Sequence, residues 1–223
     1  MSTVNIPFLA FHLLVLLFSV VIHEVAHGTV ALMLGDPTAK YAGRLTLNPL
    51  KHIDPFGTVI LPLLLLFFSI FSGMGLALFG WAKPVPYNPA HLRNPRKGAA
   101  IISLAGPAAN MLIAVIFGLL IRALSSGAFV PSGYMQTLLG AFAAIVFTNL
   151  YLALFNLIPV PPLDGSKLFV AFLPAGQWMQ ITHFMEQWGI FLLVFVIYYF
   201  VPYVSLVASF IFRLLVGVSA VGS

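Results

Sequence analysis

The sequence contains no cysteine and few charged residues, and both absences restrict what the chain can be. None of its 223 residues is Cys, and only 7% are Asp, Glu, Lys or Arg. Disulfides, thiol catalysis and Cys-ligated metals are therefore excluded, so any metal ion must be bound by His and carboxylate side chains. About a quarter of a soluble domain is charged, so this chain cannot cover a water-facing surface with ionised groups.

Long apolar runs take the place of that charge. Hydrophobic residues make up 61% of the chain, and a membrane-spanning helix needs about 20 mainly apolar residues. The first run has no basic residue before it and is too long for a signal peptide. We expect an all-α polytopic membrane protein, a bundle of about 4–6 transmembrane helices embedded in the lipid bilayer. The predicted apolar segments are 8–32, 58–82, 98–125, 136–158 and 189–217.

The polar connectors between these segments are short. Residues 33–57 carry Gly, Pro and Asp-Pro, which are typical of turns. In the stretch 42–47, polar and apolar residues alternate enough to predict a small β-hairpin-like connector. Residues 81–97 hold four prolines and four basic residues, which predicts an extended, irregular segment. No connector is long enough for a separate soluble domain, so residues 1–223 are predicted to form a single membrane-embedded domain. The basic residues lie in short loops rather than in one patch, which argues against a nucleic-acid partner.

The first apolar segment contains the sequence His23-Glu24-Val25-Ala26-His27. Residues i and i+4 share one face of a helix, so both imidazoles can bind one zinc ion. Glu24 lies next to that face, where its carboxylate can take a proton from a zinc-bound water. Ionisable side chains inside a membrane helix are costly and usually functional, which favours a zinc hydrolase over a chance match.

A hydrolytic zinc site commonly has three protein ligands and one water position, so a third ligand is needed. The acidic residues that remain are Asp36, Asp54, Asp164 and Glu186. Asp164 follows a proline-rich break at the end of the fourth apolar segment, and irregular backbone at membrane depth is tolerated only beside protein or a water-filled cavity. That setting suits a ligand, although Asp164 could also simply cap a following helix.

These motifs together resemble the site-2 protease family of intramembrane zinc metalloproteases. HEVAHG in the first segment, AGPAAN at 105–110 and NLIPVPPLDG at 156–165 carry the resemblance, and the connectors RLTLNPLKHIDPFGT and GWAKPVPYNP resemble those of compact bacterial and archaeal members. The resemblance covers roughly residues 20–170. The chain lacks a PDZ module, so gating of substrates by such a module is not expected.

The resemblance implies one zinc ion per chain, held by His23, His27 and Asp164, with Glu24 as general base. It further implies that Asn156 and Asn110 help to hold the substrate or the oxyanion. The implied substrate is a transmembrane segment of a membrane-tethered protein, cut in regulated intramembrane proteolysis. The implied location is a prokaryotic cell membrane, and the sequence leaves homo-oligomerisation open.

Other functions make different demands on the sequence. A prenyl-protein type of membrane protease would need Glu186 as a ligand, and no second-site pattern accompanies it. A transporter would have ionisable groups along several helices, whereas the later apolar segments carry only Arg122 and Arg213 near their ends. A non-proteolytic scaffold with a structural zinc site remains the alternative, although such a protein would usually lack Glu24.

The ligand positions and the basic residues together predict a topology. Asp164 must reach the same ion as His27, so the first and fourth apolar segments must end on the same face of the membrane. One of the two segments between them therefore does not cross. Both flanks of 58–82 are basic and 126–135 is uncharged, so the positive-inside rule places both flanks in the cytoplasm. We expect 58–82 to form a re-entrant segment and the active site to lie near the cytoplasmic face.

Overall fold

The computed structural model describes residues 6–60, 83–126 and 133–217, and every regular element in that part of the chain is helical. Four helical stretches there are long and apolar enough to cross a membrane. The predicted all-α, multi-pass membrane architecture is confirmed, and residues 61–82 of the predicted re-entrant segment lie outside the described part. The four stretches are α1 (Ile6–Met33), α4 (Pro95–Ser125), α5 (Gly133–Asn156) and the part Phe191–Val216 of α7 (Ala175–Val216).

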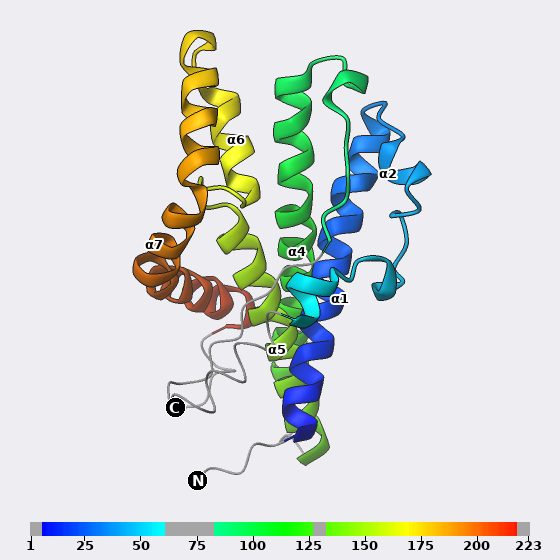
Figure 1. The fold of residues 1–223 in the computed structure, drawn as a ribbon. Coiled ribbons are helices and arrows are strands. Elements are labelled where there is room, and N and C mark those ends of the chain that lie inside the picture. Colours follow the sequence, from blue (N-terminus) through cyan, green and yellow to red (C-terminus); the bar gives the residue numbers. More distant parts are fainter. Residues whose placement is uncertain (1–5, 61–82, 127–132, 218–223) are drawn as a thin grey trace.

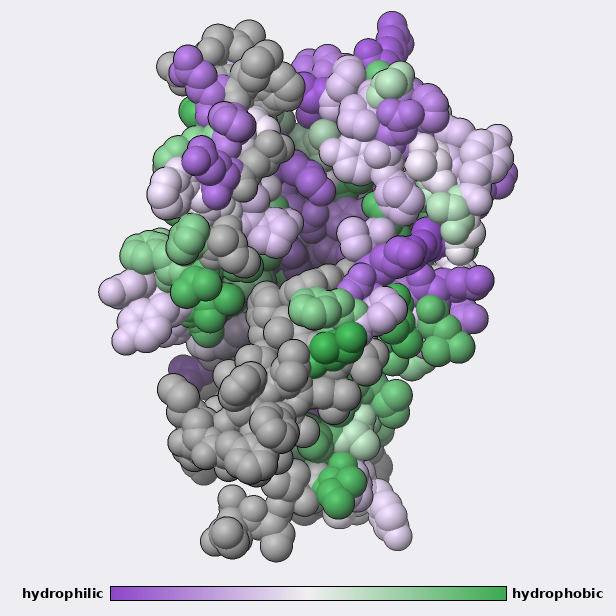
Figure 2. Space-filling model, in the orientation of Figure 1, coloured by the Kyte–Doolittle hydropathy of each residue, from purple (hydrophilic) through white to green (hydrophobic). Residues whose placement is uncertain are grey.

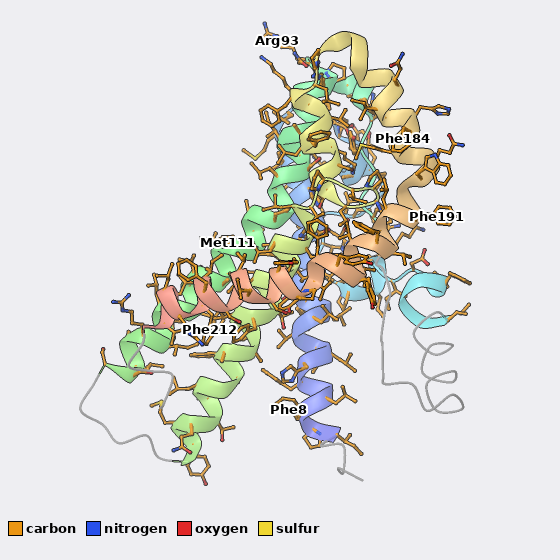
Figure 3. The ribbon with its side chains drawn as sticks, turned by 90° about the vertical axis from the view of Figure 1, so that its left-hand side faces the viewer. Phe8, Arg93, Met111, Phe184, Phe191 and Phe212 are labelled. Atoms are coloured by element: carbon orange, nitrogen blue, oxygen red, sulfur yellow. The ribbon has the colours of Figure 1, made fainter. Side chains whose placement is uncertain are left out.

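Helices α1, α4 and α5 lie side by side (Figure 1). Phe8 near the start of α1 and Arg93 just before α4 mark opposite ends of the molecule (Figure 3). Helix α4 therefore runs against α1, and α5 returns in the direction of α1. The first and fourth predicted segments thus end toward the same end of the molecule, as the topology argument requires.

Small residues bring the later helices close together. Ala114 on α4 and Ala208 on α7 are buried in one cluster with Leu150 on α5, and small side chains such as the two alanines permit close approach of membrane helices. Outward-facing side chains such as Leu112 and Phe210 are largely exposed, which suits lipid contact. Hydrophilic residues instead gather at the end that carries α2 (Thr38–Tyr41) and the start of α4 (Figure 2).

The stretch 42–47, where a hairpin was predicted, contains turns and bends and lies between two short helices, so that prediction is wrong. Gly43, at φ +64°, ends α2: its N–H donates to Lys40 O, and Arg44 N–H donates to Ala39 O. This pair of bonds is a Schellman helix end, which the period-two alternation of 42–47 does not reveal. A 3-10 turn, η1 (Pro49–Lys51), follows, and a π-helical turn, η2 (Pro55–Ile60), comes after it.

The second connector is extended from residue 83 to residue 88 and contains one 3-10 turn, η3 (Pro89–His91). It is attached to the first connector at two points. Lys83 N–H donates to His52 O at 2.8 Å, and Asn88 N–H donates to Asp36 Oδ2 at 2.7 Å. Residues 52 and 83 therefore lie together, as a re-entrant segment between them requires.

Helix α7 is one continuous helix of 42 residues, so residues 189–216 do not form a hairpin. It bends near Phe191 (Figures 1 and 3). Gly189 lies at this bend, where an added Cβ would stand 3.2 Å from Pro161 Cβ. The bend thus packs on the proline-rich turn that precedes α6 (Asp164–Phe172).

Candidate metal centre

Three side chains from two distant parts of the sequence converge inside the helical bundle. His23 and His27, one turn apart on α1, each place Nε2 at 3.0 Å from Oδ2 of Asp164, the first residue of α6. All three are largely shielded, with side-chain exposures of 7%, 10% and 13%. In the described part of the chain, this is the one group of three His, Asp or Glu residues that is compact enough to hold a metal ion.

The opposite edge of each imidazole is already occupied. His23 Nδ1 lies 2.7 Å from Oδ1 of Asn110, and His27 Nδ1 lies 2.6 Å from the backbone oxygen of Ile102. Both partners are acceptors, so both Nδ1 atoms carry the proton and donate it. A neutral imidazole protonated at Nδ1 has its lone pair at Nε2, which is the atom turned toward Asp164.

A chain of buried amides fixes the orientation of Asn110. Its Nδ2 donates to Oδ1 of Asn149 at 2.8 Å and to the backbone oxygen of Ser19 at 3.3 Å. Asn149 Nδ2 in turn donates to Ser19 Oγ at 2.9 Å. Asn110 must therefore present its oxygen to His23. Sequence reasoning missed Asn149, although an amide inside an apolar helix is itself a signal of a polar role.

Gly106 on α4 lies directly against the converging nitrogens. A Cβ at this position would stand 2.5 Å from Nε2 of both His23 and His27. The absence of a side chain leaves room at the point where the three donor atoms meet. Gly106 belongs to the AGPAAN element, in which no role for the glycine was predicted.

Local structure explains how Asp164 reaches this point. The turn before α6 contains Pro161 and Pro162, which cannot continue a helix, and it brings the chain back toward α4. Gly165 permits the start of α6 to lie on the end of α5, because an added Cβ would overlap the backbone of Leu157.

The donor set fits a zinc ion. Imidazole nitrogen and carboxylate oxygen are ordinary zinc ligands, and in a tetrahedral site the ligand atoms stand about 3.3 Å apart. The separations of 3.0 Å from each Nε2 to Asp164 Oδ2 are close to this value. Three protein ligands leave one tetrahedral position for water or substrate.

The remaining predicted residues lie in different settings. Glu24 is hydrogen-bonded through Oε2 to the N–H of Val85, at 2.8 Å. Asn156 donates to the backbone oxygen of Leu152 in its own helix, at 2.9 Å, and its role toward a substrate stays a prediction. The side chain of Glu186, the alternative ligand, lies outside the described part. Lys167, one turn after Asp164 on α6, has Nζ 3.9 Å from Asp164 Oδ1.

Comparison with known proteins identifies relatives that match most of the chain. The sequence pattern of peptidase family M50 matches residues 124–199. YwhC of Bacillus subtilis, whose name describes a putative zinc metalloprotease, is 39% identical over 193 residues, which span 85% of this chain and 80% of YwhC. Rip2 of Mycolicibacterium smegmatis, named in the same way, is 30% identical over 188 residues, which span 77% of this chain and 67% of Rip2. No solved structure gave a significant match.

Proposed function

The chain belongs to peptidase family M50, the site-2 proteases, and from that premise we propose that it is an intramembrane zinc endopeptidase of the HExxH type. The observation that carries the proposal is the convergence of His23, His27 and Asp164 on one point of a membrane-spanning bundle. Glu24 adjoins this point on the same helix. No other described group of His, Asp and Glu side chains is compact enough to hold a metal ion.

The residues have separate roles in the proposed mechanism. His23, His27 and Asp164 hold one zinc ion per chain. Zinc, when bound, supplies Lewis acidity that lowers the pKa of a bound water to about 7 and polarises a carbonyl. Glu24 takes the proton from the attacking water and passes it to the departing amine. Asn110 is fully buried and hydrogen-bonded to His23, and it orients that ligand. Its burial supports this role better than it supports contact with a substrate.

The proposed substrate is a transmembrane segment of a membrane-tethered protein, cut as part of regulated intramembrane proteolysis. The family and the multi-pass architecture support a membrane-protein substrate. Peptide groups in a helix are already paired, so the segment must unwind locally before water can attack it. Asn156 is assigned to hold the unwound backbone or its oxyanion. The active site is assigned to the cytoplasmic face of a prokaryotic membrane, on the charge pattern of the connectors.

Replacement of the general base tests this function. We expect Glu24→Gln to retain zinc and to lose nearly all cleavage, because glutamine has the shape of glutamate but cannot accept the proton. Purified wild type and variant would be compared for zinc content and for cleavage of a panel of tagged single-span proteins. Full activity of Glu24→Gln, or a wild type whose cleavage does not depend on zinc, would contradict the proposal.

A further inference from the structure

The carboxylate of Glu24 is held by a segment that is remote in sequence. Val85 N–H donates to Glu24 Oε2 at 2.8 Å across 61 residues of chain. Val85 lies between Pro84 and Pro86, which have no N–H. Among these three consecutive residues, Val85 alone can donate a backbone hydrogen bond, and its donor is directed at Glu24.

The surface of α1 is shaped to receive this segment. Gly28 is four residues after Glu24 and shares its face of the helix. A Cβ at Gly28 would stand 2.9 Å from Val85 Cγ1 and 2.7 Å from Leu45 Cδ2. The missing side chain therefore lets Val85 lie against the helix at the height at which its N–H reaches Glu24. The extended segment passes along α1 in Figure 1.

The same segment is anchored on both sides of Val85. Lys83 N–H is bonded to His52 O, and Asn88 N–H is bonded to Asp36 Oδ2. Beyond Asn88, Leu92 is buried against Ala31 of α1 and Ile102 of α4. Because the segment is anchored on both sides of Val85, the Val85 N–H can hold the Glu24 carboxylate without moving during the reaction. A preorganised contact of this kind is the most effective one in an active site.

We propose that Val85 is a positioning residue for the general base: its N–H fixes Oε2 of Glu24 and so orients the carboxylate, leaving Oε1 to take the proton. The inference rests on the proposed function of Glu24. Small losses of alignment in a reacting group are costly to the rate. The contact uses a backbone atom, so the identity of the side chain at position 85 matters little to it.

A pair of substitutions separates the N–H from the side chain. Val85→Pro removes the donor and Val85→Ala keeps it, while both alter the apolar contact that Val85 Cγ1 makes at Gly28. We expect kcat of Val85→Pro to fall about tenfold or more, the usual effect of losing one charge-assisted hydrogen bond in an active site. KM, zinc content and thermal stability should match those of Val85→Ala, which keeps the donor and should therefore retain a kcat about tenfold or more above that of Val85→Pro.

A backbone ester serves as the second variant if Val85→Pro does not fold. Replacing Val85 by its α-hydroxy acid analogue, 2-hydroxyisovalerate, exchanges only the N–H for oxygen and keeps the side chain. The same fall in kcat is expected with normal zinc content. Equal kcat in the proline, ester and alanine variants would overturn the inference, whether that shared value is the wild-type one or a reduced one. In either case an inactive, zinc-loaded Glu24→Gln enzyme would leave the proposed function standing.

Discussion

At the scale of single residues, the metal centre depends on polar groups that an apolar bundle can contain only when they are paired. His23, Asn110, Asn149 and the Ser19 hydroxyl form one chain of hydrogen bonds in which each link assigns a donor and an acceptor. In a medium of low polarity an unpaired member would be costly, so the network permits one arrangement. This arrangement presents the lone pair of His23 Nε2 to Asp164.

Gly106 gives a prediction at this scale. Gly106→Ala should sharply reduce bound zinc although every ligand is retained, because the new Cβ would stand 2.5 Å from Nε2 of both histidines. Zinc per purified chain is the measurement. Gly140→Ala on α5 is the matched control, since a Cβ there meets nothing within 4 Å, and it should bind zinc as the wild type does. Full zinc occupancy in Gly106→Ala would show that the metal lies elsewhere.

The features of the site that depend on neighbouring residues could be predicted from the sequence, whereas those that depend on which helix faces pack together could not. His23 and His27 are four apart on one helix, and Asp164 follows a run of prolines, so both features are visible in the sequence. The parts played by Gly106, Asn149 and Val85 arise from contacts between α1, α4, α5 and the second connector. No spacing in the sequence encodes those contacts.

At the scale of elements, the two connectors behave as one unit joined at Asp36. This carboxylate is fully buried and accepts hydrogen bonds from the N–H of Thr38 and of Asn88, and His91 Nδ1 lies 2.8 Å from it. Burial would raise the pKa of Asp36, but the hydrogen bonds from Thr38, His91 and Asn88 outweigh it and lower the pKa to about 2. The sequence marked Asp36 only as a possible ligand, because its partners are 52 and 55 residues away.

Asp36 gives a prediction about pH. Its folded-state pKa lies below its ordinary value, so the stabilisation is present above about pH 4, the ordinary aspartate pKa. It is lost as the pH falls from there toward 2. Asp36→Ala should lower the free energy of unfolding by about 1–3 kcal/mol at neutral pH, since it leaves buried donors unpaired.

Thermal unfolding in detergent, at a series of pH values, measures this effect. The gap in melting temperature between wild type and Asp36→Ala should narrow as the pH falls below about 4. Lys40→Ala, an exposed change on the same short helix α2, should melt near the wild-type temperature throughout. A gap that stays constant down to pH 2 would contradict the assignment of the stabilisation to the ionised carboxylate.

At the scale of the whole molecule, the site constrains how the chain crosses the membrane. His27 and Asp164 are 137 residues apart and in contact, and α1 and α5 run in the same direction. The ligand positions predicted this parity. Hydropathy predicted five apolar segments, and four of them correspond to the long helices of the described residues. The Schellman end at Gly43 escaped prediction because one glycine conformation, rather than the side-chain pattern, decided it.

Labelling of single cysteines tests the orientation, and the absence of native cysteine removes any background. Cysteines at Lys40 and Arg93, both exposed, should react from the cytoplasmic side of sealed vesicles. A cysteine at Ser132, in the uncharged loop outside the described residues, should react from the other side. Reaction of Lys40 and Arg93 positions from opposite sides would rule out the re-entrant segment, and reversal of all three would place the active site on the outer face.

The central claim is that His23, His27 and Asp164 hold a single zinc ion, and zinc counting in matched variants tests it most directly. Asp164→Ala and Glu186→Ala each remove one carboxylate that could be the third ligand. Purified under the same conditions, the wild type and Glu186→Ala should each carry about one zinc per chain, as a site with three protein ligands requires. Asp164→Ala should lose most of its zinc. Normal zinc in Asp164→Ala, together with loss in Glu186→Ala, would contradict the account.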